Sequence, residues 1–160
     1  MGMTMKVEGM EGISRMLTEV GERAGEVASK ALYAGAGVMA DAYAAAANGI
    51  TAEKFHYVFS GQKRGTSFEE KAALVGKAGI AKFEKNGSEV LTSVGTAGKL
   101  GYVEIHGHKI AVRLLANAIN KGTEFRIPSH VWRGAVSKAK GAASDAITAK
   151  AQELFDQIAK

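Results

Sequence analysis

The stretch that decides the fold is Ala116–Ala139, ANAINKGTEFRIPSHVWRGAVSKA. It holds the only proline of the chain, Pro128, and the only tryptophan, Trp132. Proline has a fixed φ and no N–H, and it holds the residue before it in an extended conformation. The stretch therefore predicts a helix end, a turn at Lys121–Thr123, an extended segment and a stiff elbow. Ser129 is the predicted N-cap of the helix that follows, with Trp132 as the core anchor.

Two long helices are predicted from apolar residues that recur at steps of three and four. The first runs from Ile13 to Ala47 and the last from Ser129 to Ala159. Most of the residues in both apolar seams are alanine, so the core between these helices is thin. We expect other subunits to complete part of its burial.

Between the helices, the sequence predicts antiparallel strands. Ile80–Val94 reads as a β-hairpin because Asn86-Gly87 suits a type I′ turn, and a bulged three-residue turn is the alternative register. Leu100–His106 is predicted as a third strand, and His108–Asn120 as a short helix capped by Gly122. The expected fold class is α+β, with a small antiparallel sheet packed with a long N-terminal helix and a long C-terminal helix.

The length of 160 residues fits a single domain, residues 1–160. Residues 50–77 are the least regular part, and we expect this region to be mobile until a partner binds. The chain has no cysteine, which excludes disulfides and thiolate metal sites. Its longest apolar run, near Ala42–Ala47, is too short to cross a bilayer, and no signal-peptide pattern is expected at the start.

The net charge is +5, and the Lys and Arg are spread along the chain. A sequence-specific nucleic-acid binder more often concentrates them on one element, with aromatic residues between them. The densest cluster, Gln62-Lys63-Arg64, is interpreted first as a solvated loop and second as a phosphate contact.

No familiar catalytic motif is present: the sequence lacks GxSxG, HExxH and a complete phosphate-binding loop. His106 and His108 flank a glycine, but no third ligand follows at metal-binding spacing. We therefore expect no enzymatic activity, no metal and no cofactor.

The order of the parts carries a resemblance. A Val-Glu-Gly-Met-Glu-Gly opening (Val7–Gly12) precedes the long helix, and Gly76-Lys-Ala-Gly-Ile80 leads into a hairpin that ends at Ser93-Val-Gly95. Ala116–Thr123, a proline elbow and Trp132-Arg-Gly-Ala135 follow. This order resembles the tail-component, or neck and tail-completion, family of tailed bacteriophages. Here Asn120-Lys121 precedes Gly122-Thr123 where the family has a glutamate, and the elbow keeps a single proline.

The resemblance implies a structural virion protein that forms a homo-oligomeric ring in the neck, six-fold or alternatively twelve-fold. The ring would complete the tail and join it to the head connector. The implied partners are further copies of the chain, tail terminator and tail tube proteins, and head-connector or portal-side proteins, near the DNA of the channel. Assembly would take place in the bacterial host cytoplasm, without a membrane. The alternative is a small basic nucleic-acid-binding protein.

A closed ring needs two different patches on each subunit. We expect one on the seam of the first helix and the other on the loop Ser60–Leu74 or at the hairpin tip. The candidate interface residues are Gln62, Lys63, Arg64, Phe68, Asn86, Gly87 and Arg133. The residues of the structural elbow are Gly122, Thr123, Pro128 and Trp132.

Overall fold

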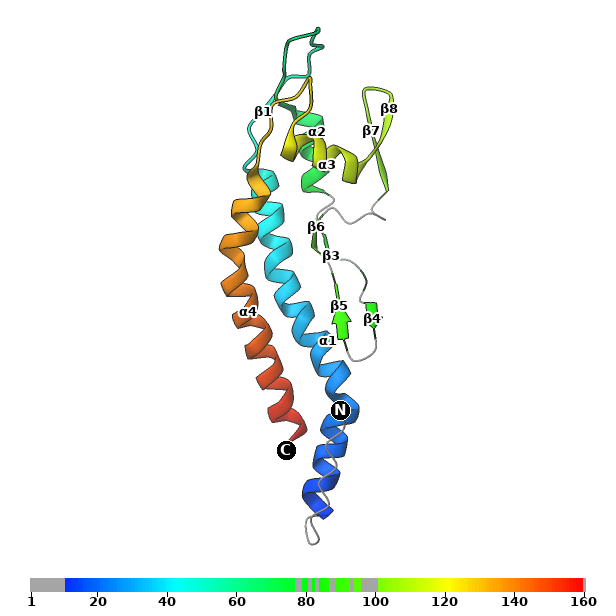
Figure 1. The fold of residues 1–160 in the computed structure, drawn as a ribbon, viewed down its shortest axis with the longest axis vertical. Helices are drawn as coiled ribbons and strands as arrows, with labels where there is room; N and C mark the ends of the chain where they lie inside the picture. Colours follow the sequence, from blue (N-terminus) through cyan, green and yellow to red (C-terminus); the bar gives the residue numbers. More distant parts are fainter. Residues whose placement is uncertain are drawn as a thin grey trace.

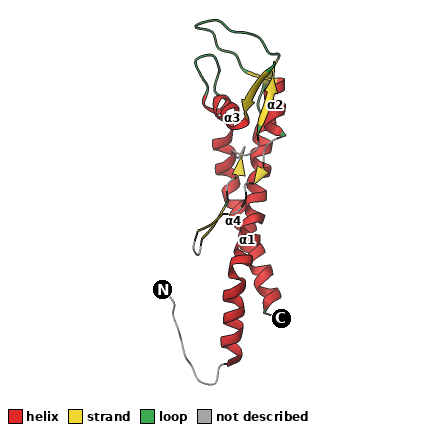
Figure 2. Ribbon diagram, turned by 90° about the vertical axis from the view of Figure 1, so that its right-hand side faces the viewer, coloured by secondary structure: helices red, strands yellow, loops and turns green. Residues whose placement is uncertain are grey.

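The structure is a computed structural model that describes residues 11–76, 79–80, 82, 84–86, 89–92, 94–95 and 101–159. The opening segment before the first helix and Gly87 at the predicted hairpin tip lie outside the described residues. The molecule is elongated (Figures 1 and 2). Two long helices run side by side, the short helices gather at one end, and some of the strands lie along the first long helix.

The two long helices are α1 (Glu11–Asn48) and α4 (Val131–Ile158), and they pack against each other in opposite directions. Small residues allow their close approach. A Cβ added at Gly35 of α1 would lie 2.9 Å from the carbonyl oxygen of Ala143 on α4 and would overlap the side chain of Ile147. The missing side chain of Gly35 therefore permits the close packing of α1 on α4.

The strands form four two-stranded pieces in the described part of the chain. β1 (Ala52–Glu53) pairs in parallel with β2 (Thr66–Ser67). The antiparallel pairs are β3 (Gly79–Ile80) with β6 (Val94–Gly95), β4 (Glu84–Asn86) with β5 (Glu89–Leu91), and β7 (Tyr102–Ile105) with β8 (His108–Ala111). The α+β class with a small antiparallel sheet and two long helices is confirmed. Figure 1 shows β3–β6 and β4–β5 beside α1, with α4 on its other side.

One detail of the strand prediction was wrong. His108–Ala111 is a strand and not the start of a helix, because His106 and Gly107 both have positive φ and reverse the chain directly after β7. In the hairpin β4–β5, whose register the sequence left open, Glu84 lies opposite Leu91 and Asn86 opposite Glu89. This register keeps the like-charged Glu84 and Glu89 from facing each other.

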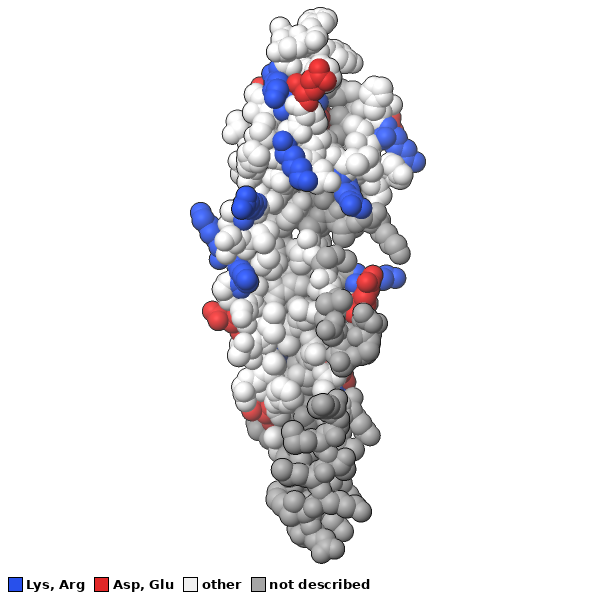
Figure 3. All heavy atoms as spheres, viewed as in Figure 1, with Lys and Arg blue, Asp and Glu red and all other residues white. Residues whose placement is uncertain are grey.

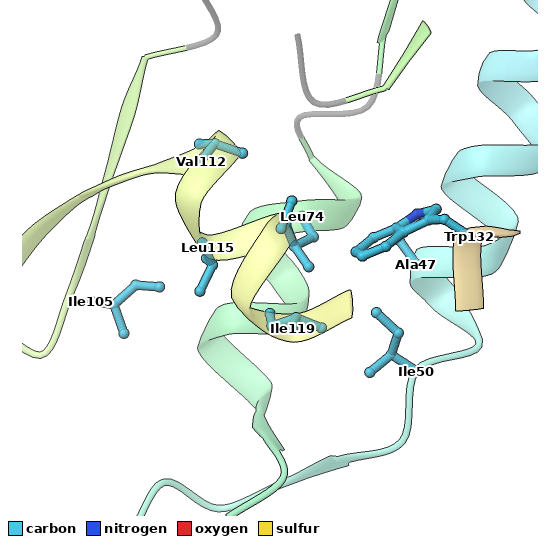
Figure 4. Close-up of a cluster of buried hydrophobic side chains, with 9 residues drawn as sticks. Ala47, Ile50, Leu74, Ile105, Val112, Leu115, Ile119 and Trp132 are labelled. Carbon is cyan, nitrogen blue, oxygen red and sulfur yellow. The ribbon is translucent and has the colours of Figure 1, made fainter. Parts of the chain in front are cut away.

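The main core lies where α2 (Phe68–Val75) and α3 (Val112–Lys121) pack near the C-terminal end of α1 and the start of α4. We call this end of the molecule the head. Figure 4 shows the Trp132 ring pointing from α4 toward Leu74 of α2. Leu74 and Ile119 are fully buried, and Trp132 stacks on Tyr43 with ring centroids 4.9 Å apart. Burying each large apolar side chain contributes about 1.5–3 kcal/mol. The prediction of Trp132 as a core anchor is confirmed.

The elbow begins at Gly122, which ends α3 with φ +77° and ψ 173°. A Cβ there would lie 2.9 Å from the carbonyl oxygen of Arg126 and 3.0 Å from Cδ of Pro128. Thr123 and Arg126 exchange backbone hydrogen bonds of 3.1 and 3.2 Å. The predicted extended segment therefore starts with a tight turn, and only its end is extended.

The helix cap was also predicted wrongly. The backbone N–H and the hydroxyl of Ser129 both donate to the carbonyl oxygen of Ile119, at 2.9 and 3.1 Å, so Ser129 is tied to the end of α3. The N-cap of α4 is His130, which has a left-handed φ of 51° and makes no side-chain capping hydrogen bond. The elbow is thus held by α3, which fixes the direction in which α4 leaves.

Candidate interaction site

The carboxylate of Glu70 organises the head end. Glu70 lies in the first turn of α2, which starts with a capping box: the Glu70 N–H donates to Oγ of Ser67 at 3.3 Å, and the Ser67 N–H donates to Oε2 of Glu70 at 2.8 Å. This local motif turns the carboxylate back toward the start of the helix. Glu70 and Ser67 are both buried.

Two arginines bind the same carboxylate. Arg64 donates from Nη1 and Nη2 at 2.9 and 2.7 Å, and Arg126 donates from Nη1 and Nη2 at 2.8 and 2.6 Å. The arginine side chains are 14% and 10% exposed, respectively. Bidentate pairs of this kind fix orientation as well as distance. We call Arg64, Glu70 and Arg126 the clamp.

The clamp keeps Glu70 charged. Burial raises the pKa of this carboxyl, but the hydrogen bonds from Arg126, Arg64 and the Ser67 N–H outweigh it, and the net pKa lies well below the ordinary range. The same contact raises the pKa of Arg64. Glu70 therefore stays ionised in the folded protein under all ordinary conditions.

The clamp joins three parts of the chain that are distant in sequence. Arg64 comes from the loop before β2, Glu70 from α2 and Arg126 from the elbow. Backbone hydrogen bonds strengthen the connection: the Arg64 N–H donates to the Phe125 carbonyl at 3.0 Å, and the Ile127 N–H donates to the Arg64 carbonyl at 2.9 Å. The clamp thereby fixes the loop to the elbow.

The loop that the clamp holds forms the end of the molecule. We call residues 54–63 the tip loop; it lies at the end of the molecule opposite to the start of α1 and the end of α4 (Figure 1). Two of its aromatic side chains and two apolar side chains of the elbow are exposed: Tyr57 (79%), Phe59 (77%), Phe125 (45%) and Ile127 (53%). We call these four residues the tip patch. An exposed apolar cluster of this kind commonly marks an interaction surface.

The base of the tip loop is fixed by stacking. Phe55 packs edge-on against Tyr57 with centroids 5.1 Å apart, and it lies 4.0 Å from the ring of His106. The guanidinium of Arg64 lies 4.8 Å from the Phe55 centroid, in a cation–π arrangement. The aromatic side chains that project from the tip therefore start from a supported base.

The structure places the predicted site residues in different parts of the molecule and with different exposure. Gln62, Lys63 and Phe68 are exposed at the head end, near the elbow. Arg64 is bound in the clamp, so its interpretation as a solvated loop residue was wrong. Arg133 is exposed on α4. Asn86 lies in β4, beside α1 and away from the head (Figure 1), so the hairpin and the loop do not form one patch.

Each of the elbow residues Gly122, Thr123 and Pro128 has a different structural role. Gly122 has the backbone conformation that only glycine adopts easily, Thr123 closes the turn, and Pro128 packs against Gly122. Sequence reasoning missed Glu70, Arg126 and the four residues of the tip patch. The Ser-x-x-Glu pattern of the capping box was an available signal for Glu70, but no local signal pairs it with Arg126, which lies 56 residues away.

The expectation that residues 50–77 are mobile stays a prediction. The clamp and the capping box give residues 64–70 defined partners, which favours order in that part of the region. The exposed tip loop is where we still expect motion.

Within the described ranges, no group of three or more His, Asp or Glu side chains is placed to hold a metal ion. Nor does any helix in this part of the chain have the length and apolar character to cross a membrane. Comparison of the chain with protein-family models, with curated proteins and with solved structures finds no match. The function is therefore argued from the site itself.

Proposed function

We propose that this chain is a structural subunit that assembles with copies of itself into a ring in the neck of a tailed bacteriophage. The observation that carries the proposal is the exposure of the tip patch, Tyr57, Phe59, Phe125 and Ile127, at one end of an elongated molecule. With average exposed fractions above one half, these side chains leave roughly 500 Å² of mostly apolar surface in water. Apolar surface exposed in this way at one end of the molecule fits a surface that a partner covers.

The stalk formed by α1 and α4 supports the same proposal. Among the stalk residues whose burial the structure describes, the buried apolar ones are small, namely Val27, Ala31, Ala36 and Ala143. Burial of such residues contributes less per turn than burial of leucine or phenylalanine. A long helix pair with a thin seam gains stability when neighbouring subunits pack along it.

The position in the neck rests on the order of sequence motifs described above. In this proposal the ring is six-fold or twelve-fold, completes the tail and joins it to the head connector. Its partners are tail terminator and tail tube proteins on one side and head-connector or portal-side proteins on the other. The protein works without catalysis, is assembled in the bacterial host cytoplasm and resides in the virion.

The proposal is tested by native mass spectrometry and negative-stain imaging of the purified chain, alone and with the neighbouring neck proteins. We expect a discrete ring in at least one of the two samples, with a subunit count that does not change on dilution. A monomer in both samples, at all concentrations, would refute the proposal.

A second function, binding of nucleic acid, is favoured by the charge distribution. Gly35 of α1 lies level with Ala143 and Ile147 of α4, which divides the molecule into a head half (residues 39–76 and 101–140) and a stalk half (residues 11–38 and 141–159). The head half has eleven Lys and Arg against six Asp and Glu, a net charge of +5; the stalk half has four against seven, a net charge of −3. Figure 3 shows Lys and Arg side chains gathered over the head and the adjoining part of α4.

Binding to duplex DNA of arbitrary sequence, measured across a salt series, tests this alternative. A phosphate-binding head predicts an affinity that falls steeply as salt rises. Affinity that is weak at low salt, or that does not change with salt, excludes it.

A further inference from the structure

The exposed side of α4 carries a short sequence repeat. Arg133-Gly-Ala-Val-Ser137 is followed by Lys140-Gly-Ala-Ala-Ser144, so a basic residue, a glycine and a serine recur at a spacing of seven residues. Seven residues are close to two turns of an α-helix, and equivalent positions therefore lie on the same side of α4. The repeat aligns its basic, glycine and serine residues along the helix.

The aligned residues form a surface of uniform chemistry. Each residue turns an α-helix by about 100°, so the residues of one sector of about 120° can be read from the sequence. We call this sector, from the start of α4 to Thr148, the basic stripe. Its residues are all exposed: Arg133, Gly134, Ser137, Lys140, Gly141, Ser144 and Thr148. The buried residues Trp132 and Ala143 lie on the other side of the helix.

The two cations of the basic stripe are not neutralised by the described residues. Neither Arg133 nor Lys140 forms an ion pair within that part of the chain, in contrast to Arg64 and Arg126. Lys and Arg side chains project from the upper part of α4 on the side away from α1 (Figure 3). Positive charge on this side of the helix is therefore available to a ligand.

The two glycines of the basic stripe leave the helix backbone accessible. A Cβ added at Gly134 or Gly141 meets no atom of the described residues within 4 Å, whereas a Cβ at Gly35 meets α4. Glycine inside a helix is less favourable than alanine, and packing among the described residues does not require it at these two positions. Glycine also permits a ligand to approach the backbone closely. The glycines thus favour a ligand that lies directly against α4.

The side chains of the basic stripe suit phosphate groups. Guanidinium, ammonium and hydroxyl groups all donate hydrogen bonds to phosphate oxygens. A protein interface usually has an apolar centre within a polar rim, whereas the centre of the stripe holds serine and glycine. From Arg133 to Thr148 the helix rises by about 22 Å, which is enough to follow several phosphates of a duplex strand at about 3.4 Å each. Charge and length therefore favour nucleic acid over a protein partner.

We propose that the basic stripe of α4 binds the phosphate backbone of duplex DNA without reading its sequence. The contact gives the nucleic-acid alternative a defined surface, and it does not depend on self-assembly. It is also separate from the tip patch, because the tip loop contains no Lys, Arg, Asp or Glu between Lys54 and Lys63. A subunit bound to DNA through the stripe leaves its tip patch available to a protein.

The test compares two double variants that change the net charge by the same amount. The stripe variant is Arg133→Gln with Lys140→Gln. The control variant is Lys30→Gln with Lys150→Gln, since these lysines lie in the stalk half and pair with glutamates of their own helices at 2.6 and 2.8 Å. Thermal unfolding by circular dichroism establishes that both variants keep the wild-type fold.

Affinity for duplex DNA of arbitrary sequence is then measured by fluorescence anisotropy across a salt series. Each lost phosphate contact lowers the slope of log affinity against log salt concentration by about 0.9. We therefore expect the slope to fall in magnitude by about 1.8 in the stripe variant and to keep its wild-type value in the control. An unchanged slope in the stripe variant refutes the proposal, and an equal fall in both variants shows that net charge alone governs binding.

A third variant, Gly134→Ala with Gly141→Ala, tests the close approach of the backbone. We expect its melting temperature to rise, because alanine favours the helix and the new methyl groups meet no described residue. Its affinity for DNA should fall, because the same methyl groups hold the phosphates away from α4. A purely structural role of the glycines would not move the two measurements in opposite directions. Wild-type affinity in this variant would overturn the placement of DNA against the helix.

Polyglutamate of matched length serves as the second probe. If it binds as tightly as DNA and loses affinity equally in the stripe variant, the stripe serves an acidic protein and the assignment to DNA is wrong. A wild-type chain that forms a ring and does not bind DNA overturns the assignment and leaves the proposed ring intact. A chain that binds DNA through the stripe and stays monomeric under all conditions overturns the ring alone.

Discussion

Replacing Glu70 by glutamine removes one negative charge from the clamp and leaves the two arginines facing a neutral amide. The side chains of Arg64 and Arg126 are almost completely buried, and both guanidinium groups bind this carboxylate through two hydrogen bonds each. Glutamine is also accepted at this position of a capping box, so the change tests the charge and largely spares the helix start.

The expected loss of stability is about 3–5 kcal/mol, because removing one partner leaves buried charge without compensation. For a chain of this length, each kcal/mol shifts the melting temperature by about 2–4 °C, so the midpoint should fall by about 6–20 °C. The matched control is Glu69→Gln, one residue earlier. The side chain of Glu69 is half-exposed and lies 3.9 Å from His106, so its replacement should leave the free energy of unfolding close to the wild-type value.

The loss of stability caused by Glu70→Gln should also depend on pH. Because the folded-state pKa of Glu70 lies below its unfolded value, its charge stabilises the fold fully above the unfolded pKa, and this contribution is lost as the pH falls toward the folded pKa. The unfolded value is about 4.3. Lowering the pH from about 6 to about 3 should therefore narrow the gap between wild type and Glu70→Gln by about 1.5–2 kcal/mol.

The assay is urea unfolding at several pH values, followed by circular dichroism and by the fluorescence of Trp132, the only tryptophan. The reasoning fails if Glu70→Gln unfolds within about 1 kcal/mol of the wild type at neutral pH, since the clamp would then lack the energetic role assigned to it. It also fails if Glu69→Gln costs as much as Glu70→Gln, or if the gap does not change with pH.

Three further predictions concern backbone and core positions. Gly35→Ala should lower the free energy of unfolding by about 1–2 kcal/mol because the new methyl group meets α4. Gly37→Ala should raise it by up to about 1 kcal/mol, since an added Cβ meets no atom of the described residues within 4 Å. Gly122→Ala should cost about 1–3 kcal/mol from its backbone conformation alone, and urea unfolding that matches the wild type would contradict this. Trp132→Ala should cost about 3–5 kcal/mol by thermal unfolding, and Trp132→Phe distinctly less, because the indole N–H has no hydrogen-bond partner among the described residues.

Local features of the sequence were enough to predict the long helices, the elbow and its anchor. The three- and four-residue steps of apolar residues set the type and approximate length of α1 and α4, because helical periodicity is a property of neighbouring residues. Gly122 and Pro128 marked the end of α3 and the bend after it for the same reason, since their allowed φ values follow from their own covalent structure. The predictions for Ser129 and for β8 were wrong because their hydrogen-bond partners lie in other segments. Ser129 donates to the carbonyl oxygen of Ile119 in α3, and β8 pairs with β7.

The exposure of the tip patch could not be predicted from the residue types alone. Trp132 and Phe59 are both large aromatic residues in apolar stretches, yet Trp132 is buried on Tyr43 and Phe59 projects into solvent. Helical periodicity after Pro128 predicted the burial of Trp132, but no local signal predicted whether Phe59 would be covered. Whether an aromatic side chain is covered depends on which elements reach it, and that is set by the whole chain.

The sequence by itself therefore determined the class of fold, the two alanine-rich helices and the stiffness of the segment from Gly122 to Pro128. Only the tertiary structure decided that Arg64 and Arg126 share the carboxylate of Glu70, that Gly35 and not Gly37 lies against α4, and that the apolar tip is left exposed. The physical reason is the distance along the sequence over which each effect acts. Periodicity and backbone preference act over a few residues, whereas ion pairing, close packing and exposure depend on segments that only the completed fold brings together.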